Sequence, residues 1–196
     1  MFQYIIFYKP YHVLSQFSPE GDKKTLKDFF PRLSTDIYPV GRLDYDSEGL
    51  LLLTNDKALN HQLLDPAYAH KRTYYVQVDG AVTEEALSNL KKGVVIQVDG
   101  KPYKTKPAVA TLIEQEPDVP ERNPPIRYRK NIPTSWIALT LTEGKNRQVR
   151  RMTAAVGFPT LRLIRYSIGK ITIDDLQPGM FKEYDSSIRS LLLSKS

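Results

Sequence analysis

The chain has 196 residues, 41% hydrophobic and 26% charged, a balance typical of a globular protein rather than a disordered one. It has no cysteine, which excludes disulfides and thiolate metal sites, and no apolar run approaches the roughly 20 residues of a membrane span. The net charge of +6 favours a polyanion as partner. These features fit a cytoplasmic protein with no membrane partner, and the three scattered histidines offer no metal site.

The predicted elements are many short strands with a few helices between them. Thr25, Asp56 and Thr83 are each expected to cap a helix, and Gly93 to close the third one. Asp99-Gly100 is a hairpin-type dipeptide. This composition predicts an α+β fold around a largely antiparallel mixed sheet with flanking helices. In chain order, strands are expected at 3–8, 37–40, 50–53, 72–78, 94–98, 108–114, 135–142, 161–166 and 168–173, and helices at 25–30, 57–65 and 84–92.

A long loop from Pro117 to Pro133 interrupts the predicted strands and holds five prolines. Loops of this length inside a compact domain are uncommon and often functional. It is a candidate RNA clamp, the alternative being a solvated excursion. The sequence contains no evident linker, so residues 1–185 are predicted to form one domain and residues 186–196 a C-terminal tail. The basic residues that would form the clamp are Arg122, Arg127, Arg129 and Lys130.

Basic residues are concentrated late in the chain. Residues 121–170 hold 11 of the 28 Lys and Arg but only two of the 22 Asp and Glu. Such asymmetry is the usual footprint of a nucleic-acid partner, although a solvated basic face without a partner would look the same.

Within this segment, residues 145–156 predict a helix that begins at an Asn146 N-cap and stops at Gly157. Arg147, Arg150 and Arg151 share one face near the helix N-terminus, where the helix dipole and their mutual repulsion disfavour cations. A bound phosphate or a buried carboxylate would relieve both conflicts.

Asp44 lies in a turn rich in Asp, Ser and Gly, which taken alone indicates only a loop. Apolar runs on both sides would place this turn at the edge of the core. A carboxylate there tends to be protonated unless a cation such as Arg42, or an arginine of the later helix, keeps it ionised. An ionised and oriented carboxylate can act as a nucleophile or a general base.

Four blocks of residues follow one another in a characteristic order: Lys9-Pro10-Tyr11, residues 41–56 with Gly41-Arg42-Leu43-Asp44, Arg72-Thr73-Tyr74-Tyr75-Val76, and Glu143 to Met152 followed by residues 161–165. Together these blocks resemble the small-subunit-type (RsuA) family of pseudouridine synthases. The resemblance covers the chain to about residue 184, and it implies the pseudouridine synthase fold with a central RNA-binding cleft.

The resemblance implies that Asp44 acts on the target uridine, either by adding to the base or at the sugar C1′. It implies that Tyr74 stacks on the flipped base, Leu163 lines the pocket below it and Arg150 pairs with Asp44. Arg42 would contact the RNA backbone beside the flipped base. The residues expected to bind RNA are Lys9, Arg72, Arg122, Arg127, Arg129, Lys145, Arg147, Arg151 and Arg165.

The chain departs from the family pattern in two respects. It begins almost at the catalytic domain, without the S4 RNA-binding module of most relatives, so RNA affinity is expected to come from the domain itself. Arg72 stands where the family usually has lysine, and the two are not interchangeable at a defined contact. The missing module and the proline-rich loop resemble members that modify large-subunit (23S) ribosomal RNA. The family uses no metal or organic cofactor, and we expect a monomer.

Two other classes of function stay open at this stage. The basic face would also suit a non-catalytic RNA-binding or ribosome-assembly protein. A hydrolase that uses Asp44 with Asp46 as a carboxylate pair is a weaker alternative, because residues two apart in a loop need not converge.

Overall fold

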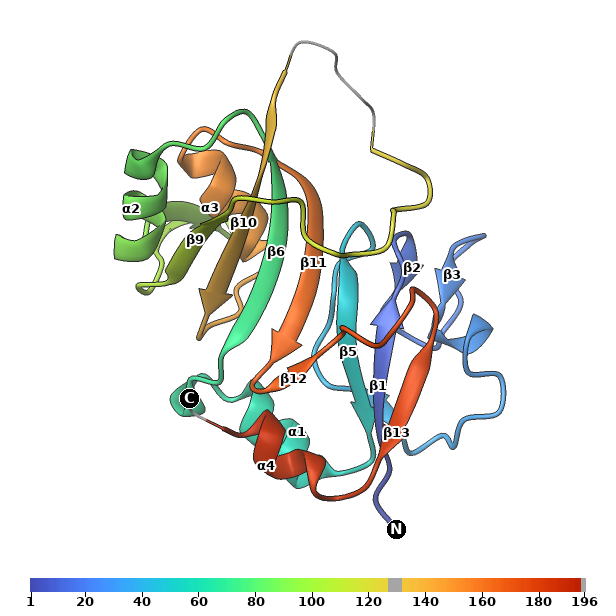
Figure 1. The fold of residues 1–196 in the computed structure, drawn as a ribbon. Coiled ribbons are helices and arrows are strands. Elements are labelled where there is room, and N and C mark those ends of the chain that lie inside the picture. The colour runs from blue at the N-terminus through green and yellow to red at the C-terminus, as the bar shows by residue number, and fades with distance from the viewer. Residues whose placement is uncertain (127–131, 195–196) are drawn as a thin grey trace. The chain divides into compact units, whose positions relative to one another are not determined.

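The structure is a computed structural model that describes residues 1–126 and 132–194 (Figure 1). The chain forms two compact units, and each is taken by itself. The first unit comprises Met1–His70 and Arg165–Ser196, and the second Lys71–Ile164. Strand β11 (Thr160–Ile168) carries the chain from the second unit back into the first. Within the part of the chain that the structure describes, no helix has the length and apolar character needed to cross a bilayer.

The first unit is built on strand β1, which pairs antiparallel with β5 on one edge and β13 on the other. Every residue of β1 and β5 is buried, as expected for strands covered on both faces. One core cluster combines Ile5 and Phe7 of β1 with Leu51 and Leu53 of β5. The strands of this unit are β1 (Tyr4–Lys9), β2 (Val13–Leu14), β3 (Lys24–Thr25), β4 (Tyr38–Pro39), β5 (Glu48–Thr54), β12 (Ile171–Thr172) and β13 (Phe181–Tyr184).

Two of the predicted helix caps lie in the first unit and are confirmed. Thr25 caps a 3₁₀ turn, Leu26–Asp28, in a capping box, and the Asp56 carboxylate caps α1 (Lys57–Leu64) by accepting from the Leu59 amide at 3.0 Å.

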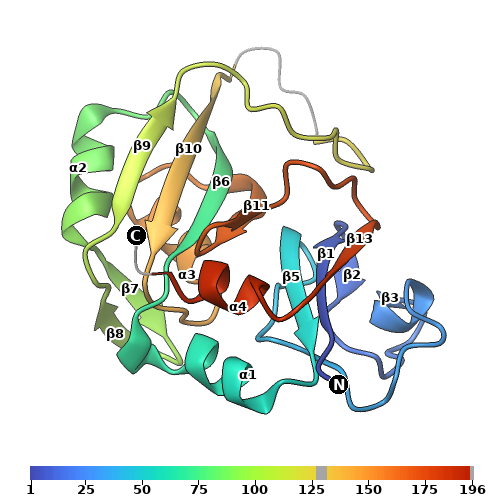
Figure 2. The same ribbon diagram turned by 60° about the horizontal axis from the view of Figure 1, so that its bottom comes forward.

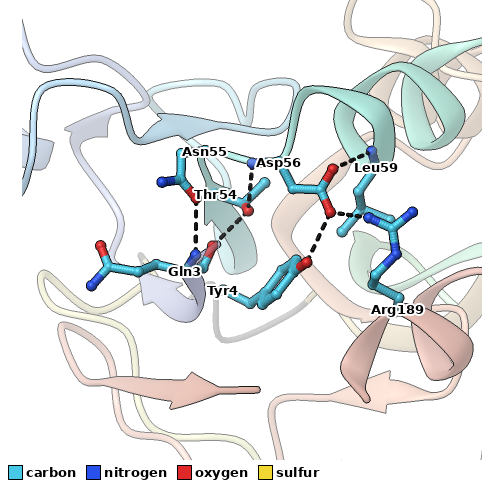
Figure 3. Close-up of polar contacts among 7 residues, drawn as sticks. All are labelled: Gln3, Tyr4, Thr54, Asn55, Asp56, Leu59 and Arg189. Carbon is cyan, nitrogen blue, oxygen red and sulfur yellow. Dashed lines mark hydrogen bonds and ion pairs between the residues drawn. The ribbon is translucent and has the colours of Figure 1, made fainter. Parts of the chain in front are cut away.

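Residues 186–196 were expected to be a tail. Of these, the described residues 186–194 belong to the first unit, and α4 (Ile188–Leu192) buries Ile188 and Leu192. Asp56 also accepts hydrogen bonds from Tyr4 Oη at 2.8 Å and from Arg189 of α4 (Figure 3). One buried carboxylate therefore joins β1, α1 and α4, which a sequence pattern of polar residues does not reveal.

In the second unit β10 lies between β6 and β9, antiparallel to both. Helix α2 lies along β9 in both views (Figures 1 and 2). A hairpin joins β7 to β8 through Asp99 and Gly100, both with positive φ as the dipeptide predicts. The elements are β6 (Arg72–Asp79), α2 (Glu84–Lys92), β7 (Val95–Val98), β8 (Lys101–Lys104), β9 (Val109–Ile113), β10 (Thr134–Leu141) and α3 (Gln148–Ala155).

The predicted α+β class with a largely antiparallel arrangement is confirmed. The prediction of separate strands at 161–166 and 168–173 was wrong. Strand β11 runs unbroken to Ile168, and only Ile171–Thr172 follows as β12. The short strands β2, β3, β8 and β13 were not predicted. Short strands have too few residues to show an alternating pattern.

Candidate active site and RNA-binding residues

The turn that carries Asp44 is fixed to the first unit by a buried serine. Ser15 Oγ accepts from the Leu43 amide at 3.1 Å and donates to the Leu43 carbonyl at 2.8 Å. The Ser47 amide then closes the turn on the Asp44 carbonyl at 3.0 Å. Asp44 itself is half-buried. The carboxylate that the sequence singles out therefore lies on a turn whose backbone is held on both sides.

Aromatic stacking supports the same turn from the N-terminal side. The His12 ring stacks between Tyr11 and Tyr45, with centroid distances of 3.8 Å and 4.7 Å. The His12 amide also donates to the Tyr45 carbonyl at 2.8 Å. Tyr45 directly follows Asp44, so this stack restricts the residue next to the proposed nucleophile.

Lys9 has a different place from the one expected of an RNA contact. Its side chain is fully buried, and Nζ donates to the carbonyls of Pro10 at 2.9 Å and Val13 at 2.7 Å. Burial lowers the pKa of Lys9 to about 7, while the carboxylates of Glu48, Asp46 and Asp44 oppose the shift. We therefore correct the prediction: Lys9 is a buried side chain beside the Asp44 turn and not an RNA contact.

Arg165 is also buried, which corrects its predicted role as a phosphate ligand. Its Nε donates to the Leu50 carbonyl at 2.7 Å, and its charge contributes to lowering the pKa of Lys9. The Arg165 backbone passes so close to Gly49 that a Cβ there would lie 2.4 Å from the Arg165 carbonyl oxygen. Gly49 also has a φ of +104°, so β5 requires glycine at this position.

The residues from Glu143 to Met152, called the arginine block below, lie in the second unit. They include the start of the predicted helix, which begins at a different residue from the one expected. The N-cap of α3 is Arg147 and not Asn146; Arg147 has a left-handed φ of 50° and makes no side-chain cap. The Asn146 side chain instead accepts from Arg151 at 3.0 Å. A non-glycine residue in this conformation is strained and occurs often at functional sites.

The cations of the block differ in exposure. Arg147 and Lys145 are exposed, whereas Arg150 is half-buried. Arg151 is half-buried too, and its guanidinium donates to the Gln97 carbonyl of β7 as well as to Asn146. Arg147 and Lys145 are therefore the members most accessible to a phosphate.

The other predicted site residues of the second unit lie on β6 and β11. Tyr74 is half-buried on β6 and packs against the core cluster that contains Leu163, which is itself buried. Arg72, at the start of β6, lies near the arginine block, with Nη1 4.0 Å from where a Gly144 Cβ would be. The structure thus brings Arg72 to the block that the sequence separates from it by 70 residues.

The part of the proline-rich loop that the structure describes is organised by arginines. Arg122 donates to the carbonyls of Pro124 at 2.8 Å and Pro125 at 3.2 Å, and Arg162 donates to the Pro120 carbonyl at 2.7 Å. Arg127 and Arg129 lie outside the described residues.

Asp44 and Arg42 belong to the first unit, and Tyr74, Arg150 and Leu163 to the second. Arg42 is exposed, as a backbone contact requires. Sequence reasoning missed Ser15, because a serine in a loop has no distinctive pattern. It also assigned no role to Glu143, although this residue opens the arginine block.

A carboxylate on a fixed turn, together with exposed cations, fits an α+β enzyme that acts on RNA. A family model described as RNA pseudouridylate synthase matches residues 3–155. The chain belongs to this family and is an isomerase that converts uridine in RNA to pseudouridine. The resemblance to the RsuA type is likewise confirmed.

Among curated relatives, ribosomal large subunit pseudouridine synthase E of Vibrio parahaemolyticus is 55% identical over 179 residues, covering 91% of this chain and 72% of the relative. Its namesake from Xanthomonas axonopodis pv. citri is 50% identical over 176 residues, covering 89% and 90%. A crystal structure of a pseudouridylate synthase superposes with a TM-score of 0.80 at 28% identity, covering 98% of this chain and 74% of that one.

Proposed function

We propose that this enzyme isomerises a specific uridine of large-subunit (23S) ribosomal RNA, with Asp44 as its nucleophile. The observation that carries the substrate assignment is the 50% identity to a large subunit synthase E over 90% of that relative's length. Support for Asp44 comes from its half-buried position on a turn held by Ser15 and from its electrostatic interaction with the buried Lys9 side chain.

The reaction requires the target base to leave its stack, which costs a few kcal/mol. The N1–C1′ bond then breaks, the uracil turns, and a bond forms between C5 and C1′. C5 loses its proton and N1 gains one, so the product is an isomer of uridine. No atom is added and no redox change occurs, so the chemistry calls for no metal or organic cofactor. We further propose that the enzyme acts as a monomer in the cytoplasm.

Asp44 would act on the nucleotide as an ionised carboxylate. Arg150 would pair with it and keep it ionised, Tyr74 would stack on the flipped base, and Leu163 would line the pocket below. The support is the order and spacing of the family's blocks in this chain together with the local geometry: a half-buried arginine in α3 and a half-buried tyrosine beside a buried leucine.

RNA phosphates would be bound by the accessible cations, which include Arg42, Lys145 and Arg147. Arg72 stays in the proposal as a neighbour of the arginine block. Arg122 stays in it as a member of the proline-rich loop, together with Arg127 and Arg129. Arg151 of α3, which donates to the Gln97 carbonyl of β7, would also contribute to phosphate binding. Affinity should therefore fall steeply as salt rises.

The decisive experiment measures tritium release from large-subunit ribosomal RNA carrying uridine tritiated at C5. Asp44→Asn should reduce release to background while RNA binding persists. Asp46→Asn, which removes a negative charge from the same turn, is the matched control and should keep most of the activity. Release by the Asp44→Asn variant at the level of the control would contradict the synthase mechanism. An Asp46→Asn variant as inactive as Asp44→Asn would favour a carboxylate pair.

A second experiment separates the roles of the arginines. Arg150→Ala should slow single-turnover release by more than it weakens RNA binding, because its proposed partner is Asp44. Equal losses in rate and affinity would assign Arg150 to the RNA backbone.

A further inference from the structure

Glu143, which has no role in the proposed mechanism, is a buried carboxylate at the start of the arginine block. Its Oε2 accepts from the Tyr103 hydroxyl at 2.6 Å, and its Oε1 accepts from the Lys106 amide at 2.8 Å and from Gln148 Nε2 at 2.6 Å. Burying a carboxylate is costly unless hydrogen-bond donors replace the lost water. Three donors on two oxygens meet that requirement.

The orientation of Gln148 shows that the site demands an acceptor. Gln148 Oε1 accepts from the Lys145 amide at 2.9 Å, so its amide nitrogen must face Glu143. The Lys106 amide can only donate as well. The hydrogen bond to Glu143 is also the main reason that the pKa of Tyr103 is raised. The carboxylate form of Glu143 satisfies all three partners at once.

These contacts join the β7–β8 hairpin to the arginine block. Tyr103 belongs to β8, and its ring lies 4.8 Å from the Lys145 ammonium. Arg151 of α3 donates to the Gln97 carbonyl of β7, which is a second contact between the arginine block and the hairpin. Gln148 is the first residue of α3, so Glu143 holds the helix start directly.

We propose that Glu143 is a positioning residue, whose carboxylate fixes the start of α3 against the β7–β8 hairpin and thereby aims Arg147 and Arg150. The helix start needs such support because its N-cap, Arg147, has a left-handed backbone and provides no side-chain cap. The inference rests on the proposed roles of Arg147 and Arg150.

The test replaces Glu143 by Leu, which keeps a similar size but removes both acceptor oxygens, so that the Lys106 amide, Gln148 Nε2 and the Tyr103 hydroxyl all lose their partner. Hydrogen exchange at the Lys106 amide should accelerate, and the single-turnover rate of tritium release should fall about tenfold. Tyr103→Phe removes one donor only and should cause a smaller loss. Leu90→Val is the matched control, because it weakens the buried core on α2 without touching the network.

At equal loss of melting temperature, a merely structural role predicts equal activity for Glu143→Leu and Leu90→Val. A Glu143→Leu rate within twofold of that control would therefore overturn the proposal. Unchanged exchange at Lys106 would overturn it too. In the double variant with Tyr103→Phe, the rate losses should not multiply, because both changes act on one network; losses that multiply contradict the coupling. Tritium release by Asp44→Asn would refute the proposed function separately. Hydrogen exchange at the Lys106 amide would still test the positioning role of Glu143 in that case.

Discussion

The Asp44 turn and the arginine block are held in opposite ways. Around Asp44, Lys9 and Arg165 are buried and donate to backbone carbonyls, and only Arg42, on the turn itself, is exposed among the basic residues discussed for this region. In the arginine block Lys145 and Arg147 are exposed. There the buried charge is an anion, Glu143. The difference teaches that basic residues of similar motifs can have two roles. Some are buried and donate hydrogen bonds to the protein backbone, and others remain exposed, where RNA could reach them.

The largest expected effect on stability concerns Gly49, which packs against the Arg165 backbone beside the Asp44 turn. Gly49→Ala should lower the free energy of unfolding by at least about 3 kcal/mol, because its Cβ would overlap the Arg165 backbone. Gly100→Ala is the control: its φ is also positive, at +76°, but nothing lies within 4 Å of the added Cβ. It should cost about 1 kcal/mol. Similar urea midpoints for the two variants would mean that the close approach is not constraining.

The next prediction concerns the buried cation. Folded Lys9 releases its proton near pH 7, whereas the unfolded residue does so near 10.5. Between these values the unfolded state holds more protons, so the free energy of unfolding rises with pH. Relative to Lys9→Met, the wild type should gain about 2 kcal/mol between pH 7 and pH 9 in urea titrations.

Exposed Lys24 provides the control for this comparison. Lys24→Met should follow the wild-type pH dependence. If Lys9→Met and the wild type changed in parallel, Lys9 would not be the titrating group.

A smaller effect is expected at Ser15. Ser15→Ala leaves the buried Leu43 amide without its acceptor and should cost about 1–2 kcal/mol. Because the Asp44 turn loses its anchor, turnover should fall more than RNA affinity does. Ser18→Ala, at an exposed position, should change neither quantity. An unaltered kcat in Ser15→Ala would show that the turn is held by its other contacts.

The smallest effect on stability is expected in the second region. Arg147→Gly suits the left-handed backbone and should leave the melting temperature within a few degrees, while RNA affinity falls about 3–10-fold. The salt dependence of binding should decrease by about one phosphate contact. Arg147→Ala should lose the same affinity but be about 1 kcal/mol less stable than the glycine variant. Unchanged affinity in both would remove Arg147 from the RNA surface.

Sequence patterns predicted the elements that carry their own local information. Asp56 and Thr83 cap helices as expected, because capping depends on residues only three positions apart. The turn at Asp99-Gly100 followed from backbone preferences of the same short range. The N-cap of α3 was mispredicted, because the Asn146 side chain bonds to Arg151 instead of to the helix amides.

The candidate site was predictable only in part. Asp44, Tyr74 and the arginines follow from family motifs, which record chemistry but not burial. Lys9 and Arg165 belong to such motifs, yet both are enclosed in the first unit. A basic residue looks the same in a sequence whether it binds a phosphate or a backbone carbonyl.

By itself, the sequence determined the family, the reaction and the candidate nucleophile, because these depend on residue types in a fixed order. The tertiary structure decided which cations remain accessible to RNA, and it revealed Ser15 and Glu143 as supports of the two regions. The physical reason is that burial and hydrogen bonding arise between residues far apart in the chain: Ser15 meets Leu43, and Glu143 meets Tyr103 and Lys106, only after folding.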